Sequence, residues 1–220
     1  SGSTDIQGQP VNVGTHDPLE DIQFVEEEFD LWFKEILDRE WPKLVKEIDQ
    51  KRAKITDGIT RRFTGLGILE SQVDQVLISK SLKAKKAQDW SEDDIMDFLK
   101  ALRKTAKPLL IAANKADLCD DLKIIEKIST NFKVIPSSAE TELLLRKATK
   151  AELINYVPGD ENFSGKEGVQ LSEQQNNALH LAKNVLTKIQ TTGVQEILNS
   201  IIFDVLDMII VYPVEDETKL

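Results

Sequence analysis

The sequence predicts an α/β protein that is mostly helical. Over residues 17–107, apolar residues recur every three or four positions, which is the spacing of helices that bury one face. At Pro108 the pattern changes to two short apolar runs separated by one helix, an order typical of parallel strands joined by a helix. Helical spacing returns over 172–205. Together these observations predict a small parallel sheet in a largely helical chain.

The first helix is expected to begin at Asp17. The Asp17 side chain can cap it, Pro18 suits its first turn, and the Glu20 carboxylate can reach back to a free amide. Pro42 interrupts this helix, and a second helical stretch follows and ends at Gly65. We expect the two to pack face to face through their apolar positions. These are Ile22, Val25, Phe29, Trp32, Phe33, Ile36 and Leu37 in the first, and Leu44, Val45, Ile48, Ile55, Ile59 and Phe63 in the second.

Two further helices complete a helical domain over 17–107, which follows a loop or linker over 1–16 that is rich in Gly, Ser, Thr, Gln and Pro. Ser91 can cap the second of these helices, with Asp94 three residues on, and Lys107-Pro108 ends it. The weaker helix before it carries Leu69, Val73, Val76 and Leu77, and a lysine-rich connection follows it.

A domain of different character is expected over 108–207. Leu109–Ala113 is a continuous apolar run, which predicts a strand buried on both faces. A helix from about Asp120 to Thr130 follows, and Lys133–Ile135 is the second short strand. Ligands of such open sheets bind at the carboxyl ends of the strands, so the residues that follow each strand are the candidates for a binding site.

The last part of the chain is expected to contain two helices and a strand. Ser172 can cap a helix that runs to about Gln190, and Thr191-Thr192-Gly193 separates it from the next. Met208–Tyr212 has the composition of a strand, and an apolar strand needs a partner. We therefore expect it either to pair with an earlier strand or to begin a further domain over 208–220.

Two short motifs follow the two predicted strands, and their chemistry suits a guanine base. In Asn114-Lys115-Ala116-Asp117, the two carboxylate oxygens of Asp117 can accept both donors on one edge of guanine, the N1–H and the amino group. The Asn114 side chain can bond the purine and tie neighbouring loops together. The stem of Lys115 can lie over the base while its ammonium stays in water.

The second motif, Ser137-Ser138-Ala139, offers a backbone amide. The N–H of Ala139 can donate to the guanine O6, whereas adenine carries an amino group there and is repelled. A structural alternative is that Asn114 and Asp117 cap the next helix and that Ser137 and Ser138 form a turn. Because both motifs directly follow predicted neighbouring strands, we favour nucleotide recognition.

A phosphate-binding motif is missing from the sequence. A P-loop requires Gly, four residues, then Gly-Lys-Ser or Gly-Lys-Thr, since its amides wrap the phosphates. The segment Gly159–Lys166 has five residues between its glycines, and the Glu167 carboxylate that follows would repel phosphate. The segment Pro10–Thr15 has no lysine. No Asp-x-x-Gly switch motif occurs either, so we expect that this chain by itself does not hydrolyse GTP.

Composition argues against an internal disulfide, a histidine metal site, a membrane span and broad attraction to nucleic acid. The single Cys119 cannot form an internal disulfide, and we expect it to be a small apolar filler. His16 and His180 are too distant in sequence for metal-ligand spacing. No apolar run reaches the about 18 residues of a membrane span, and a cytoplasmic location is expected. A net charge of −10 opposes broad attraction to nucleic acid.

Two basic clusters are local exceptions to this acidic balance. They are either the solvated faces of helices or sites that contact RNA or an acidic partner. The first cluster consists of Lys51, Arg52, Lys54, Arg61 and Arg62, and the second of Lys80, Lys83, Lys85 and Lys86.

The sequence resembles the Obg-related, YchF-type GTPases associated with translation, especially their archaeal branch. The resemblance extends over nearly the whole chain. It is carried by the blocks Ser1-Gly2-Ser3-Thr4-Asp5, His16-Asp17-Pro18-Leu19-Glu20-Asp21, Phe63-Thr64-Gly65-Leu66-Gly67-Ile68, Ala112-Ala113-Asn114-Lys115-Ala116-Asp117-Leu118, Pro136-Ser137-Ser138-Ala139-Glu140, Tyr156-Val157-Pro158-Gly159-Asp160 and Val211-Tyr212-Pro213-Val214-Glu215-Asp216.

This resemblance implies that the chain is the later part of a P-loop GTPase domain with an inserted helical domain. The P-loop and the Mg²⁺ ligands would lie in a segment before Ser1, and 208–220 would begin a TGS domain. Because Asp117 is kept, GTP or GDP is expected rather than ATP. The longer protein would be a GTPase switch in translation, with guanine bound by Asn114, Lys115, Asp117, Ser137, Ser138 and Ala139. The alternative is a helical module that binds the ribosome or RNA without nucleotide turnover.

Overall fold

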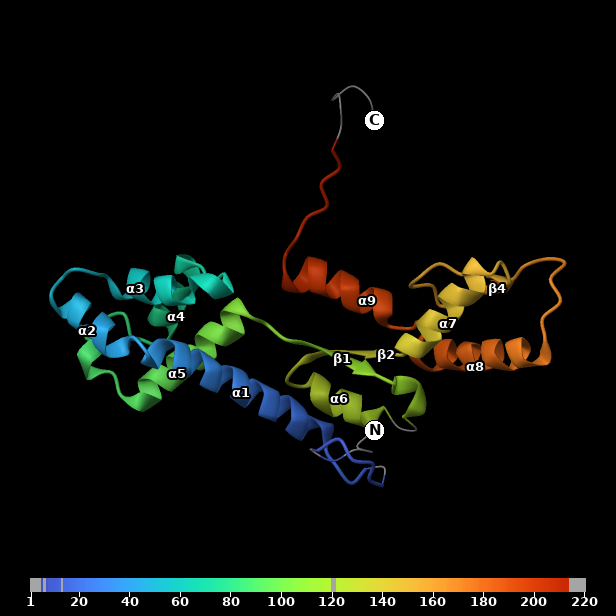
Figure 1. Ribbon diagram of the computed structural model, residues 1–220, viewed down its shortest axis with the longest axis horizontal. Coiled ribbons are helices and arrows are strands. Elements are labelled where there is room, and N and C mark those ends of the chain that lie inside the picture. The colour runs from blue at the N-terminus through green and yellow to red at the C-terminus, as the bar shows by residue number, and fades with distance from the viewer. Residues whose placement is uncertain (1–4, 6, 13, 120–121, 214–220) are drawn as a thin grey trace. The chain divides into compact units, whose positions relative to one another are not determined.

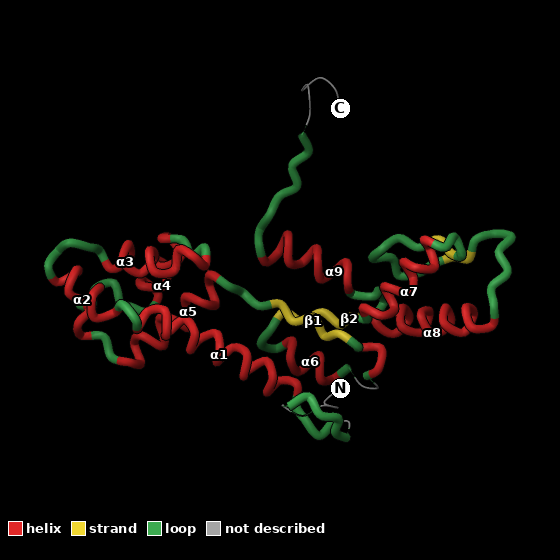
Figure 2. Tube along the Cα trace, viewed as in Figure 1, coloured by secondary structure: helices red, strands yellow, loops and turns green. Residues whose placement is uncertain are grey.

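The computed structural model describes residues 5, 7–12, 14–119 and 122–213 of the 220-residue chain. It divides into two compact units, which meet in sequence between Leu109 and Leu110 (Figures 1 and 2). We call the part up to Leu109 the helical unit and the part from Leu110 the sheet unit. The fold is thus α/β and mostly helical with a small parallel sheet, as predicted.

The helical unit is built from five α-helices within its described residues. They are α1 (Pro18–Asp38), α2 (Trp41–Asp49), α3 (Ile55–Phe63), α4 (Glu70–Ser79) and α5 (Glu92–Ala106). The Asp17 side chain accepts a hydrogen bond from the Leu19 amide, and Ser91 and Asp94 form a reciprocal capping box, so both predicted caps are confirmed. The predicted loop over 1–16 includes residues 1–4, 6 and 13, which lie outside the described residues.

The predicted single helical stretch after Pro42 is wrong, because the chain forms two helices there. Pro42 lies in the first turn of α2, and α2 ends at Asp49. Lys51 then adopts a left-handed conformation with φ 55°, which a continuing helix cannot contain. The chain restarts as α3 and packs back on α2. A Cβ on Gly58 would come 2.2 Å from Leu44 Cδ1, which shows how closely the two helices approach.

The core of the helical unit contains the later part of the predicted apolar stripe of α1. Phe33 and Leu37 are buried, and the Phe33 ring stacks on Phe63 with a centroid distance of 5.2 Å. The earlier stripe positions Val25, Phe29 and Trp32 are exposed, which corrects the prediction that the whole face is buried. The buried face of α1 is the adjacent one, which carries Asp30, Phe33 and Leu37.

A buried ion pair joins the first and last helices of this unit. The Arg103 side chain on α5 is 2% exposed and donates to Asp30 over 2.6 Å and to Glu26 over 2.8 Å, both on α1. A buried guanidinium is tolerated only with such partners, because an unpaired buried charge costs several kcal/mol, about 3 to 5 when one partner is removed. Arg103 therefore fixes how α5 lies against α1.

The sheet unit begins with the predicted strand, helix, strand order. Strand β1 (Leu110–Asn114) pairs in parallel with β2 (Lys133–Ser137), and α6 (Lys123–Ser129) lies between them in sequence. The predicted helix start at Asp120 lies outside the described residues. The prediction that β1 is buried on both faces is wrong: Ala112 is exposed, and the sheet has two strands in the described chain.

The rest of the sheet unit is helical apart from one short hairpin. Its elements are α7 (Ala139–Lys150), the antiparallel pair β3 (Ile154–Asn155) and β4 (Ser164–Gly165), α8 (Glu173–Ile189), α9 (Val194–Asn199) and a π-helical segment (Ser200–Val205). The capping box of Ser172 and Gln175 at α8 is confirmed. Sequence reasoning missed α7 and the hairpin. The signal for α7 was Ser138, which caps this helix, with Thr141 three residues on.

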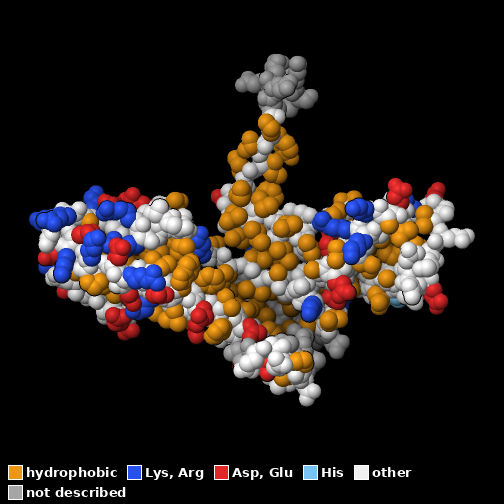
Figure 3. All heavy atoms as spheres, viewed as in Figure 1, with side chains coloured by type: hydrophobic (Ala, Val, Ile, Leu, Met, Phe, Trp, Pro, Cys, Tyr) orange, Lys and Arg blue, Asp and Glu red, His pale blue; other side chains and the backbone are white. Residues whose placement is uncertain are grey.

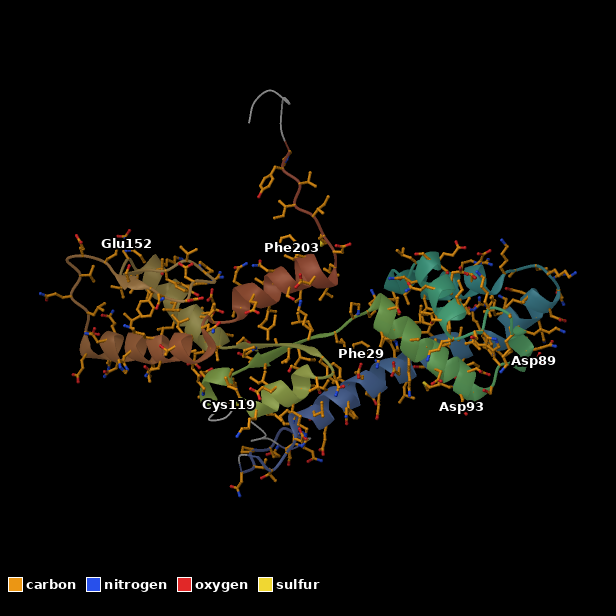
Figure 4. The ribbon with its side chains drawn as sticks, turned by 180° about the vertical axis from the view of Figure 1, so that it is seen from behind. Phe29, Asp89, Asp93, Cys119, Glu152 and Phe203 are labelled. Carbon is orange, nitrogen blue, oxygen red and sulfur yellow. The ribbon has the colours of Figure 1, made fainter. Side chains whose placement is uncertain are left out.

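The predicted strand Met208–Tyr212 is wrong. These residues have no regular secondary structure and are 53–81% exposed. Figure 3 shows their apolar side chains on the segment that follows the π-helical turn, where Figure 4 labels Phe203. An extended segment becomes a strand only when another strand satisfies its amides and carbonyls. In the described residues β1 and β2 pair with each other and neither pairs with this segment.

None of the helices in the described part of the chain combines the length and the hydrophobicity needed to cross a bilayer.

Candidate functional site

The two polar motifs meet at one edge of the parallel sheet. Asn114 is the last residue of β1 and Ser137 the last of β2, and the two are directly opposite in the strand register. The carboxyl ends of parallel strands lie at the same edge, where open α/β sheets bind ligands. The residues that follow each strand are therefore brought together by the sheet itself.

A hydrogen bond closes the gap between the two motifs. The Ala139 amide donates to Asn114 Oδ1 over 3.1 Å. Asn114 thus ties the two loops together, as its residue type indicated, and it does not cap the helix that follows its own strand. The same contact engages the Ala139 N–H that we expect to donate to guanine O6. A base can use this amide only if the amide is shared between two acceptors or released by Asn114.

Lys115 bends the chain between Asn114 and Asp117. Its φ is 63°, in the left-handed region, and it precedes a single 3₁₀ turn, Ala116–Leu118. A non-glycine residue in this region costs about 1 kcal/mol or more, and such strain concentrates at functional sites. The bend takes the chain directly from the sheet edge into the turn that carries Asp117.

Asp117 lies at an apolar cavity of about 480 Å³ within the sheet unit. This size is typical of small-molecule pockets, which combine apolar walls with few polar groups. Leu118, Leu144 and Leu181 supply apolar wall, and Glu140 adds a second carboxylate. The cavity lining includes neither Asn114 nor Ser137–Ala139, so the structure brings these residues together at the strand ends and puts Asp117 at the cavity beside them.

Helix α8 holds the Asp117 turn in position. Lys188 Nζ donates to the backbone oxygen of Asp117 over 3.3 Å and also to the carbonyl of Cys119. Cys119, labelled in Figure 4, is half-buried at the end of this turn. An ammonium bound to carbonyls of this turn stabilises its conformation and so holds Asp117 at the cavity that it lines.

The Ser137-Ser138 pair has a structural role in this structure. Both residues are at most 2% exposed. Ser138 Oγ caps α7 and lies 2.8 Å from Thr141 Oγ1, and the Ser138 amide donates to the Thr192 carbonyl over 2.9 Å. The structural alternative predicted a turn at these serines, whereas Ser138 is the cap of α7. The serines fix the loop, which leaves Ala139 as its contact residue at the surface.

A buried carboxylate supports this loop from behind. Glu142 on α7 is 4% exposed and accepts hydrogen bonds from Tyr156 over 2.7 Å, from Thr192 over 2.6 Å and from Arg146 over 2.5 Å. Burial alone would raise the pKa of Glu142, but these three hydrogen bonds outweigh burial and lower it. Burial and the bond to Glu142 raise the pKa of the Tyr156 phenol.

Thr192 links Glu142 to the Ser137-Ser138-Ala139 motif. Its hydroxyl donates to Glu142, and its carbonyl accepts from the Ser138 amide. Gly193 follows with φ 75°, and a Cβ there would lie 2.0 Å from the Pro136 oxygen. Sequence reasoning treated Thr191-Thr192-Gly193 as a helix separator and missed Glu142, because contacts across 50 residues leave no local pattern.

Replacing Glu142 by Gln is expected to lower stability at neutral pH and to weaken its pH dependence. A carboxylate whose folded pKa is lowered stabilises the fold above its unfolded pKa, and this contribution is lost as pH falls through the folded pKa. The wild-type chain should therefore lose more unfolding free energy than Glu142→Gln between pH 7 and acidic pH. Urea unfolding at several pH values measures this, and parallel curves would contradict the assigned role. Glu152→Gln, a change at an exposed residue, is the control.

Within the described residues, no group of three or more His, Cys, Asp and Glu side chains is arranged to hold a metal ion.

Comparison with known proteins agrees with the geometry of this site. Residues 112–216 match the family model described as "Obg-like GTPase YGR210-like, G4 motif-containing domain", a range that contains both motifs. An uncharacterized GTP-binding protein of Methanocaldococcus jannaschii is 40% identical over 222 residues, which cover 100% of this chain and 54% of the relative. The crystal structure of a GTP binding protein from Pyrococcus horikoshii OT3 has a TM-score of 0.78 and 38% identity, covering 99% of this chain and 58% of that chain. The chain thus spans little more than half the length of either protein.

Proposed function

We propose that this chain is the guanine-recognising part of a GTPase. It is a homologue of archaeal GTP-binding proteins, and one of its segments matches the G4 motif-containing domain of Obg-like GTPases. The observation that carries the proposal is the register of Asn114 with Ser137, joined by the hydrogen bond from Ala139 to Asn114. This contact makes one surface from two motifs whose chemistry suits a guanine base.

In the proposed complex, the Asp117 carboxylate accepts from the guanine N1–H and amino group. The Ala139 amide donates to O6 and shares its hydrogen between O6 and Asn114, as three-centre hydrogen bonds allow. The Lys115 stem covers one face of the base. The apolar cavity beside Asp117 supports this arrangement, because its leucine side chains offer an apolar surface next to the residue that recognises the base.

We further propose that the phosphate-binding half is supplied by another segment of a longer protein, which would hold GTP and Mg²⁺ and act as a switch in translation. Two observations support a phosphate-binding segment elsewhere in a longer protein: the sequence has no P-loop motif, and both relatives are longer than this chain. The resemblance to translation-associated GTPases supports the role as a switch in translation. Asp117 favours GTP over ATP, because adenine lacks the N1–H and the 2-amino group that a carboxylate binds.

Calorimetric titration of the longer protein with GDP and ADP tests the proposal. GDP should bind at least about 100-fold more tightly than ADP, since adenine has no donors for the Asp117 carboxylate and would leave its acceptor oxygens unpaired. Equal affinity for the two nucleotides would refute guanine recognition by this chain.

Replacing Lys115 by Gly should affect the stability of the fold and the affinity for guanine in different ways. Glycine adopts φ 63° without strain, so stability should rise by about 0.5–1 kcal/mol or stay unchanged. Guanine affinity should fall about 10-fold in the longer protein, because the stem over the base is lost. The matched control is Lys51→Gly, where φ is 55° in the helical unit. It should relieve the same strain with unchanged guanine affinity, and a similar loss of affinity in both variants would argue against the role of Lys115.

A further inference from the structure

The positive charge of this acidic protein is concentrated in one part of the helical unit. Residues 39–86 contain twelve Lys and Arg against six Asp and Glu, an excess of six positive charges in a chain of net charge −10. This range includes α2, α3 and α4. Figure 3 shows Lys and Arg side chains gathered over these helices. Such charge asymmetry is typical of proteins that bind a polyanion with one surface and repel it elsewhere.

Within this region the structure has a polar pocket of about 400 Å³. It lies where the end of α1, the start of α2 and the end of α3 meet, so side chains distant in sequence converge on it. Its charged lining consists of Arg39, Glu40, Lys43, Glu47, Arg61 and Arg62. Four cations against two carboxylates leave this pocket positive.

The cations of the pocket differ in how they are held. Arg62 forms the fixed part: its side chain is 9% exposed, pairs with Glu40 over 3.1 Å and donates to the Gly58 carbonyl over 2.7 Å. Its Nε is buried and has no hydrogen-bond partner among the described residues. Arg61 and Lys43 are exposed, and neither forms an ion pair with a carboxylate of the described chain. Arg39 is exposed and pairs with Glu35 over 2.7 Å. The pocket thus combines two paired guanidinium groups, one of them mostly buried, with two cations that are available to a ligand.

The second basic cluster is less available. Lys83 pairs with Asp74 over 2.8 Å, and Lys85 pairs with Asp94 over 2.6 Å. The hydrogen bond from Lys85 also contributes most to lowering the Asp94 pKa to about 2. Local carboxylates therefore already neutralise half of this cluster. Two of the four pocket cations are paired in the same way, but the pocket brings its cations together around one cavity, and this makes it the stronger candidate for a ligand of opposite charge.

We propose that this pocket binds phosphodiester groups of an RNA strand through Lys43 and Arg61, and through Arg39, whose exposed guanidinium exchanges Glu35 for a phosphate. Guanidinium groups bind phosphate oxygens through two parallel hydrogen bonds, a geometry suited to phosphodiesters. The pocket is larger than one phosphate needs, and the excess positive charge continues beyond it through 46–54, as a strand with several phosphates requires. This site lies wholly in the helical unit and does not depend on guanine recognition.

Fluorescence anisotropy with a labelled single-stranded RNA of about 20 nucleotides and the whole 220-residue chain tests this proposal. The triple variant Arg39→Gln, Lys43→Gln, Arg61→Gln should weaken binding at least about 10-fold and reduce the slope of log affinity against log salt by about 2–3. The matched control, Lys80→Gln, Lys83→Gln, Lys86→Gln, removes the same charge and should change affinity less than about threefold. All six positions are exposed, and thermal unfolding verifies that both variants fold.

Three results would overturn the proposal. Equal weakening by both triple variants would mean diffuse attraction without a site in the pocket. Competition by polyglutamate as strong as by unlabelled RNA would identify an acidic protein as the better partner. Absence of RNA binding at low salt would exclude the interaction. DNA of the same sequence, measured in parallel, should compete through the shared phosphodiester chemistry and should bind no more tightly than RNA.

Discussion

Replacing Asp117 by Asn in the longer protein is expected to reverse its base preference from guanine to xanthine. The variant should bind GDP at least about 100-fold more weakly, because an amide in place of the carboxylate loses two charge-assisted hydrogen bonds and turns an N–H toward the donors of guanine. Xanthine has an oxygen where guanine has its amino group, and this oxygen can accept from the Asn amide. Titration with GDP and xanthosine diphosphate measures both changes.

The control for this experiment is Glu140→Gln. Glu140 lines the same cavity and undergoes the same change of charge and shape, but it lies outside both motifs. It should alter the affinity for either nucleotide less than about threefold, as expected for a charge that is not hydrogen-bonded to the base. If Asp117→Asn left GDP affinity unchanged, or if both variants lost it equally, Asp117 would not be the residue that recognises guanine.

Replacing Gly193 by Ala is expected to destabilise the sheet unit by about 3 kcal/mol or more. An alanine Cβ would lie 2.0 Å from the Pro136 oxygen and 2.9 Å from Ser137 Cα, and both are backbone atoms of the strand that carries the second motif. Neither can move without disturbing β2 and the bond from the Ser138 amide to Thr192. Urea unfolding measures the loss, and in the longer protein guanine affinity should fall with it.

Gly168→Ala is the matched control for backbone strain. Its φ of 78° is close to the 75° of Gly193, but a Cβ there would meet nothing within 4 Å. This variant should lose only about 1 kcal/mol, the cost of a left-handed alanine. If Gly193→Ala lost no more than Gly168→Ala, the close approach of Gly193 to β2 would not constrain the motif.

Features set by local sequence were predicted well. The caps at Ser91 and Ser172 depend on residues three positions apart and the cap at Asp17 on an amide two positions on, and all three are found in the structure. The order of β1, α6 and β2 was also visible, because each element has its own apolar pattern. From that order alone, Asn114 and Ser137 were expected at the same edge of a sheet, and their register supports this expectation.

Features that depend on distant partners were not predictable. Val25 and Trp32 belong to a regular apolar stripe, yet burial requires a neighbouring helix, and α5 contacts the adjacent face of α1 through Glu26 and Asp30. Met208–Tyr212 has strand composition but no strand to pair with in the described residues. The Glu142 network joins residues 14 and 50 positions apart, which no periodicity reveals.

We propose above all that this chain recognises the guanine base and makes no contact with the phosphates of the guanine nucleotide. The direct test is to titrate the 220-residue chain with guanosine, GDP and adenosine and to monitor the backbone amide signals of Asp117 and Ala139 by NMR. Guanosine should shift both amide signals and adenosine neither, and GDP should bind within about threefold of guanosine, since no phosphate contact adds affinity. GDP binding about 100-fold tighter than guanosine, or equal shifts with adenosine, would contradict it.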